Sequence, residues 1–137
     1  MKFTNKNSNK KPPAGHNFYK PGNTFHENSL DRYDNTIDDS YKKSSYSDWD
    51  IEKMFELRCS KDVAIELEKY FQQNTWPYED KNYKKNVEKY YGKPFGHYTK
   101  DTGVSELRLV KDKLVTELIQ ILKDRTKDWK DEKKVLN

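Results

Sequence analysis

The chain has 137 residues and a formal net charge of +4, with 36% charged and 32% hydrophobic residues, so its length allows one modest domain. No run approaches the ~18 apolar residues of a membrane helix, and the single cysteine, Cys59, excludes an intrachain disulfide framework. Residues 1–20 lack the apolar stretch of a secretory signal. We therefore expect a soluble, intracellular protein, cytoplasmic or organellar, without membrane contact.

Residues 1–46 are predicted to form a disordered or extended basic arm. They contain Asn, Lys, Ser, Gly and Pro in no periodic order, and residues 1–20 carry lysines but no acid. Pro12-Pro13 and Pro21-Gly22 oppose regular structure. Scattered aromatic residues suit docking into a larger partner, and the alternative is a solvated tail with incidental aromatics. These residues are Phe3, Phe18, Tyr19, Phe25, Tyr33 and Tyr41.

Residues 47–137 are predicted to form a helical domain that begins at Ser47, which has the form of a capping box. The first helix is expected over roughly 48–58, because three apolar residues there share one face: Ile51, Met54 and Phe55. Ser60 is the cap candidate for a second helix to about residue 73. Its apolar stripe consists of Val63, Ala64, Leu67, Tyr70 and Phe71.

Two further helices are predicted in the C-terminal half. One covers roughly 79–91 and ends before Gly92, a natural helix-terminating residue. The other is long, from about 104 to 132, with a broad apolar stripe that comprises Leu107, Val110, Leu114, Val115, Leu118, Ile121, Leu122 and Trp129. The pattern therefore predicts an all-α fold, a small bundle of three or four helices with a long C-terminal helix after the arm.

No residue set has the spacing of a catalytic or metal site. The histidines, His16, His26 and His97, do not pair at helical spacing, and a second cysteine for zinc is absent from the sequence. Cys59 lies beside an apolar stripe, where a structural cysteine is more common than a reactive one. We expect no enzyme, no catalytic residues, no metal or other cofactor, and no small-molecule substrate.

Aromatic and basic residues alternate irregularly between residues 78 and 100. Lysines neutralise phosphates and aromatic rings stack on unpaired bases, so this stretch is a candidate surface for RNA or another partner. The alternative is an ordinary amphipathic helix with a tyrosine core and a lysine surface. Together with part of the arm, the candidate binding residues are Lys81, Tyr83, Lys84, Lys85, Lys89, Tyr90, Tyr91, Lys93, His97, Tyr98, Lys100, Lys10, Lys11, Phe18, Tyr19 and Lys20.

Two functions follow as hypotheses. The first is a non-catalytic accessory subunit of a larger, RNA-containing assembly, which docks through the helical domain and the arm. The second is a protein–protein interaction module, such as an inhibitor, adaptor or scaffold subunit, without nucleic-acid contact. The near balance of acidic and basic residues from residue 46 onward favours the second hypothesis.

Overall fold

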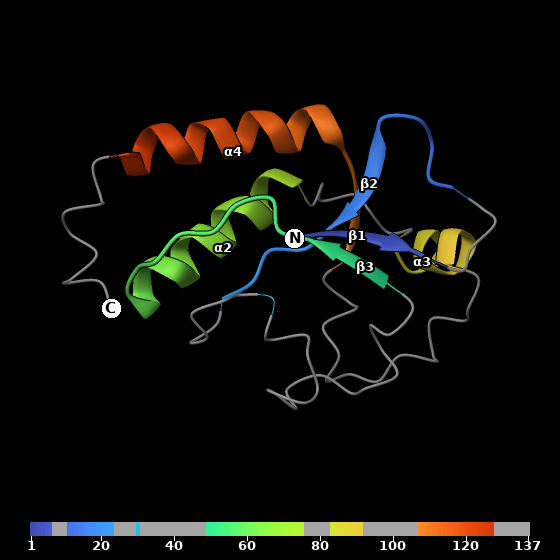
Figure 1. Cartoon of the computed structure of the whole chain (residues 1–137), viewed down its shortest axis with the longest axis horizontal. Coiled ribbons are helices and arrows are strands. Elements are labelled where there is room, and N and C mark those ends of the chain that lie inside the picture. Colours follow the sequence, from blue (N-terminus) through green and yellow to red (C-terminus); the bar gives the residue numbers. More distant parts are fainter. Residues whose placement is uncertain (7–10, 24–29, 31–48, 76–82, 92–106, 128–137) are drawn as a thin grey trace.

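The computed structural model describes residues 1–6, 11–23, 30, 49–75, 83–91 and 107–127. Within this part the chain combines a four-stranded antiparallel sheet with helices (Figure 1), so the all-α bundle predicted from the sequence is wrong. The boundary expected between residues 46 and 47, with the Ser47 capping box, lies outside the described residues.

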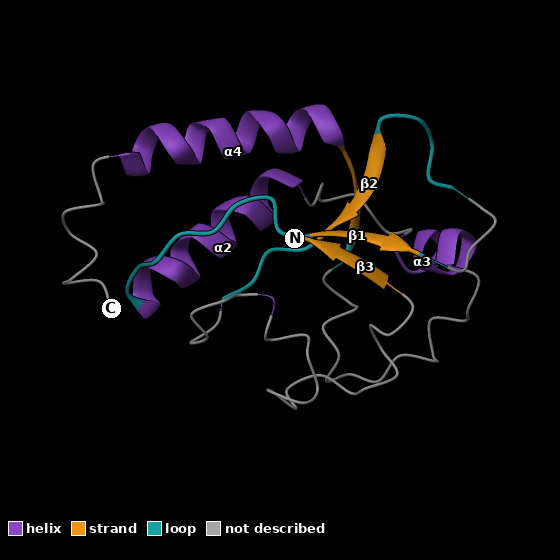
Figure 2. Ribbon diagram, viewed as in Figure 1, coloured by secondary structure: helices purple, strands orange, loops and turns teal. Residues whose placement is uncertain are grey.

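Four short strands form the sheet. They are β1 (Lys2–Asn5), β2 (His16–Tyr19), β3 (Trp49–Glu52) and β4 (Arg108–Lys111), in the spatial order β3-β1-β2-β4 (Figure 2). The register sets Ile51, Phe3, Phe18 and Leu109 in one row across the sheet. The described part of the predicted arm thus supplies both central strands, because its apolar residues are buried by pairing with strands far along the chain.

Among the described residues, three helices accompany the sheet: α2 (Lys61–Thr75), α3 (Tyr83–Tyr91) and α4 (Asp112–Thr126). The prediction of a helix after Ser60 is confirmed, and the Ser60 hydroxyl accepts a hydrogen bond from the Val63 N–H at 3.3 Å. Helix α3 lies within the predicted range 79–91, of which residues 79–82 are outside the described part. In Figure 1, α2 and α4 run alongside each other, and α3 lies at the far end of the sheet.

One face of the sheet, here called the α3 face, carries the larger aromatic core. Because side chains alternate along a strand, Phe3, Phe18 and Trp49 point to the same side, where they are almost fully buried with Leu107. The Trp49 ring meets Phe3 and Phe18 edge-on, with ring centroids 6.1 and 5.8 Å apart. Tyr90 of α3 covers this core, with its ring 6.4 Å from that of Phe18.

The opposite face, the α4 face, packs against α2 and α4 at the β2–β4 end. Tyr19 and Val110 point to this side and form a buried cluster with Val115 of α4. Phe71 of α2 and Leu114 of α4 pack against the cluster. Toward β3 and β1 the same face is more polar, because Asp50, Glu52 and Thr4 there are exposed.

Two of the predicted helices are corrected by the structure. The helix expected over roughly 48–58 is absent from its described residues, since 49–52 form a strand and 53–58 have no helical structure. The helix expected from about 104 is wrong at its start. Residues 49–52 form β3, because Trp49 and Ile51 point into the core while Asp50 and Glu52 point to solvent, which is the period of a strand. Residues 108–111 form β4 and pair with β2, although their apolar side chains fit the helical stripe that follows. Helix α4 therefore begins at Asp112, and its Ile121 is 39% exposed instead of buried.

Candidate functional site

The open side of β3, here called the β3 edge, is the candidate functional site. Strand β3 ends the sheet order and pairs with β1 along one side; on its other side, the described part of the chain supplies no partner strand. Such an edge presents backbone groups that another extended chain can pair with. Helices α3 and α4 both contact β4, the opposite edge strand, and α4 continues directly from it.

The direction of the β3 backbone groups follows from the neighbouring pairs. Met1 and Lys20 exchange two backbone hydrogen bonds, of 3.1 and 3.0 Å, as a hydrogen-bonded pair does. Since hydrogen-bonded pairs alternate along antiparallel strands, Lys2 directs its N–H and C=O toward Glu52 of β3. The backbone N–H and C=O of Asp50 likewise point toward β1. Those of Ile51, which lies between Asp50 and Glu52, point outward to the β3 edge.

The side chains of β3 have opposite character on its two faces. On the α3 face, Ile51 packs against the core of Phe3, Phe18, Trp49 and Leu107. On the α4 face, the side chains of Asp50 and Glu52 are 70% and 65% exposed. A chain added at the β3 edge would therefore meet an apolar row on one face and an acidic row on the other.

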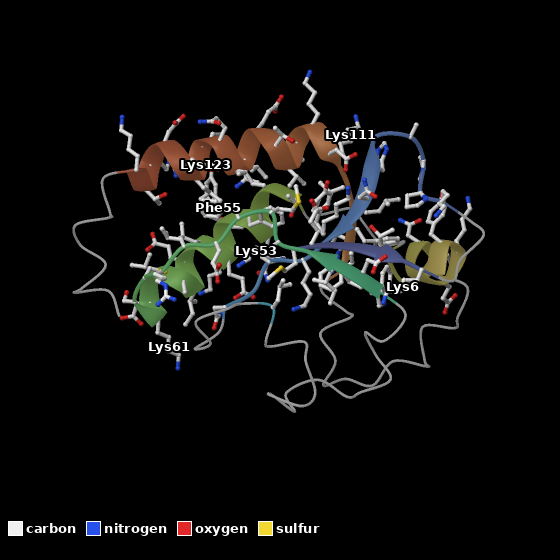
Figure 3. The ribbon with its side chains drawn as sticks, in the orientation of Figure 1. Lys6, Lys53, Phe55, Lys61, Lys111 and Lys123 are labelled. Atoms are coloured by element: carbon white, nitrogen blue, oxygen red, sulfur yellow. The ribbon has the colours of Figure 1, made fainter. Side chains whose placement is uncertain are left out.

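The acidic row has weak ion pairs on its β1 side. The Lys6 Nζ lies 3.6 Å from a carboxylate oxygen of Asp50, and the Lys2 Nζ lies 4.0 Å from one of Glu52. Figure 3 shows Lys6 beside β3. Ion pairs this exposed contribute little to stability, so the two carboxylates keep the capacity to attract cations from the side of the β3 edge.

A second polar cluster lies where β2 meets the start of α4. Tyr19 and Asn17 both donate hydrogen bonds to the carboxylate of Asp112, at 2.5 Å from the hydroxyl and at 2.8 and 3.1 Å from the amide. Burial raises the pKa of Tyr19, and its bond to Asp112 raises it further. Burial alone would raise the pKa of Asp112, but the two hydrogen bonds, with the charges of Lys2 and His16, lower it overall. The cluster holds α4 on the sheet.

The predicted binding residues of the arm are divided between core and surface. Phe18, Tyr19 and Lys20 are buried, with 2%, 3% and 1% exposure, whereas Lys11 is exposed. The aromatic pair predicted to anchor a partner therefore builds the sheet core. Lys10 lies outside the described residues.

The aromatic–basic stretch is described only in α3. Lys85 and Lys89 are exposed, and the Lys89 Nζ lies over the Tyr90 ring at 5.1 Å from its centroid. Tyr90 is half-buried against Phe18. The backbones of Tyr83, Lys84 and Tyr91 belong to α3. The remaining candidates lie outside the described residues: Lys81, Lys93, His97, Tyr98 and Lys100.

Sequence reasoning missed the β3 edge, although its signal was present. Trp49-Asp50-Ile51-Glu52 alternates apolar and charged residues, as an edge strand with one buried face does. The stretch is short, and Ile51, Met54 and Phe55 also fit one face of a helix. The apolar spacing therefore predicted a helix there.

Other features of the described residues point to no chemistry. Burial raises the pKa of the Cys59 thiol, whose Sγ lies 3.9 Å from the Leu57 carbonyl oxygen, and a raised pKa lowers the fraction of the thiol present as the reactive thiolate. In the described ranges, His, Cys, Asp and Glu side chains form no group of three that could hold a metal ion. None of the described helices is long and apolar enough to cross a membrane.

Comparisons of the chain with protein-family models, with curated proteins and with solved structures found no match.

Proposed function

We propose that this chain is a non-catalytic protein–protein interaction module that binds an extended segment of its partner along the β3 edge. The observation that carries the proposal is the outward backbone of Ile51 on an edge strand whose other side is paired to β1. Adding a strand to an open sheet edge is a recurrent way of recognising peptides, in which backbone hydrogen bonds supply affinity and the flanking side chains supply specificity.

Support for RNA docking is weaker. A protein that binds single-stranded RNA usually combines exposed aromatic rings with basic side chains. In this chain Tyr90 packs against Phe18, and Phe18 and Tyr19 are buried. Lys85 and Lys89 on α3 are exposed and are the remaining described candidates for phosphate contacts. The RNA-containing assembly stays a prediction, which a salt titration of the full chain against oligouridylate tests, because phosphate contacts make affinity fall steeply with salt. Affinity that is absent at low salt, or insensitive to salt, would refute it.

Hydrogen exchange at the amide of Ile51 tests the proposed function directly. Peptides from a random display library are selected on the full chain, and amide exchange is followed by NMR with and without the best binders. We expect binders to slow exchange of the Ile51 amide, whereas the amides of Asp50 and Glu52 already bond to β1 and change little. Binders that leave exchange at Ile51 unchanged would overturn the proposal.

A matched pair of variants separates the backbone contact from side-chain packing. Ile51→Pro removes the outward N–H, and proline is tolerated on an edge strand where that group faces solvent. Ile51→Ala loses similar packing but keeps the N–H. Peptide binding is expected to persist in Ile51→Ala and to be lost in Ile51→Pro, with circular dichroism showing that both variants fold. Equal binding by the two folded variants would contradict the proposal, and the exchange measurement on the unaltered chain decides it if either fails to fold.

A further inference from the structure

The charge pattern of the β3 edge restricts its partner. Resting on the proposed function, we infer that the docked segment is an extended stretch of a protein in which basic and apolar residues alternate. The inference depends on the two faces of β3, one apolar and one acidic, which a newly added strand extends.

On the α3 face the added strand continues an apolar surface. Ile51 is half-buried beside the core formed by Phe3, Phe18, Trp49 and Leu107. Directly paired residues of neighbouring strands lie on the same face, with Cβ atoms about 5 Å apart. An apolar side chain opposite Ile51 would therefore cover the part of this residue that is still exposed.

On the α4 face the added strand meets Asp50 and Glu52. Both carboxylates are more than half exposed, and their lysine partners, Lys6 and Lys2, approach from the β1 side at 3.6 and 4.0 Å. Cations opposite Asp50 and Glu52 on the new strand would complete a row in which each carboxylate lies between two positive charges. Acidic residues at those positions would face like charge, which destabilises strand pairing.

The same pattern opposes pairing of two copies of the chain through β3. An antiparallel pair centred on Ile51 matches the outward backbone groups of both strands. It also sets Asp50 of each copy opposite Glu52 of the other, twice in the pair. This repulsion is a device that edge strands use against self-association, and it leaves a segment of opposite charge as the favoured occupant.

Two short peptides of equal length test the inference, one alternating lysine with valine and one alternating glutamate with valine. Their affinities for the full chain are measured by fluorescence anisotropy at low salt, and NMR follows exchange of the Ile51 amide. We expect the lysine peptide to bind at least tenfold tighter and to protect the Ile51 amide. The double variant Asp50→Lys/Glu52→Lys is expected to reverse this preference.

A matched control removes charge elsewhere. Glu66 of α2 and Glu117 of α4 are exposed acids away from the sheet, so Glu66→Gln/Glu117→Gln changes net charge as much as Asp50→Asn/Glu52→Gln does. The lysine peptide should lose several-fold affinity for the Asp50→Asn/Glu52→Gln variant and less than twofold for the control. Equal losses would overturn the inference, because attraction would then reflect net charge alone.

The outcomes also separate this inference from the proposed function. If peptides of any charge protect the Ile51 amide equally, docking at the β3 edge holds and the basic partner is refuted. If the lysine peptide binds without protecting that amide, both proposals fail.

Discussion

The hydroxyl of Tyr19 in β2 donates a hydrogen bond of 2.5 Å to the carboxylate of Asp112, the first residue of α4. The Asp112 N–H in turn donates to the carbonyl of Gly15, at 2.8 Å. Gly15 has a φ of +76°, which glycine adopts without the strain of a side chain. The turn before β2 and the start of α4 are thus joined through one aspartate, and this joint sets the direction in which α4 leaves β4.

Removing the Tyr19 hydroxyl tests this joint. Tyr19→Phe keeps the buried ring but leaves Asn17 as the remaining side-chain donor to Asp112. A hydrogen bond to a charged group contributes about 1.5–3 kcal/mol, so we expect the free energy of unfolding in urea to fall by roughly that amount. Tyr70→Phe is the control, since Tyr70 is half-buried and contacts Arg125 through its ring. An equal effect of the two substitutions would contradict the role of the Tyr19 hydroxyl.

Stability should also depend on pH through Asp112. Hydrogen bonds and nearby positive charge hold its folded pKa below the ordinary value of 3.8. The resulting stabilisation is present above pH 3.8 and is lost as the pH falls through the lower, folded pKa. Urea unfolding from pH 5 to pH 2 measures it. Asp112→Asn should show a shallower loss of stability over this range, and parallel curves for the two proteins would refute the assignment.

Phe18 distinguishes a core strand from a docking arm. Phe18 is 2% exposed between Trp49 and Tyr90, and truncation of a buried phenylalanine costs about 3–5 kcal/mol. Phe18→Ala is therefore expected to lower the unfolding free energy by that amount or to prevent folding. Lys11→Ala, in the exposed segment before β2, should change the unfolding free energy by less than about 0.5 kcal/mol. Unchanged stability in Phe18→Ala would restore the prediction of an arm that serves only to dock.

Ser60 tests the start of α2. Its hydroxyl accepts the Val63 N–H, and its carbonyl accepts the Ala64 N–H at 2.9 Å. Loss of such a cap typically costs about 1 kcal/mol, which is the expected effect of Ser60→Ala on thermal unfolding. Lys61→Ala, at the exposed neighbouring position, should cause no loss, because a cation at a helix N-terminus is not stabilising. If Ser60→Ala leaves thermal unfolding unchanged, packing alone determines where α2 begins.

Much of the helical structure could be read from local signals. The apolar spacing after Ser60 predicted α2, and the stripe of Leu114, Val115, Leu118 and Leu122 predicted the body of α4. Three of these four side chains, Val115, Leu118 and Leu122, are indeed buried. A helix bonds each residue to one four positions away, so its signals lie within a single stretch of sequence.

The candidate site could not be found in the same way. Lys85 and Lys89 are exposed as predicted for α3, but Phe18 and Tyr19 became core residues once β2 paired with β1 and β4. The β3 edge exists only because β1, some 45 residues earlier in the chain, pairs with Trp49–Glu52.

By itself the sequence determined α2, the position of α3, the body of α4 and the apolar side of α4, because those properties depend on neighbours within one or two turns. Only the tertiary structure decided that residues 2–5, 16–19, 49–52 and 108–111 are strands. Each of these strands is four residues long, too short for its own periodicity to distinguish strand from helix or coil. Their conformation is settled by hydrogen bonds to distant segments, and the same pairing that buries Phe3 and Phe18 leaves Ile51 facing outward at the β3 edge.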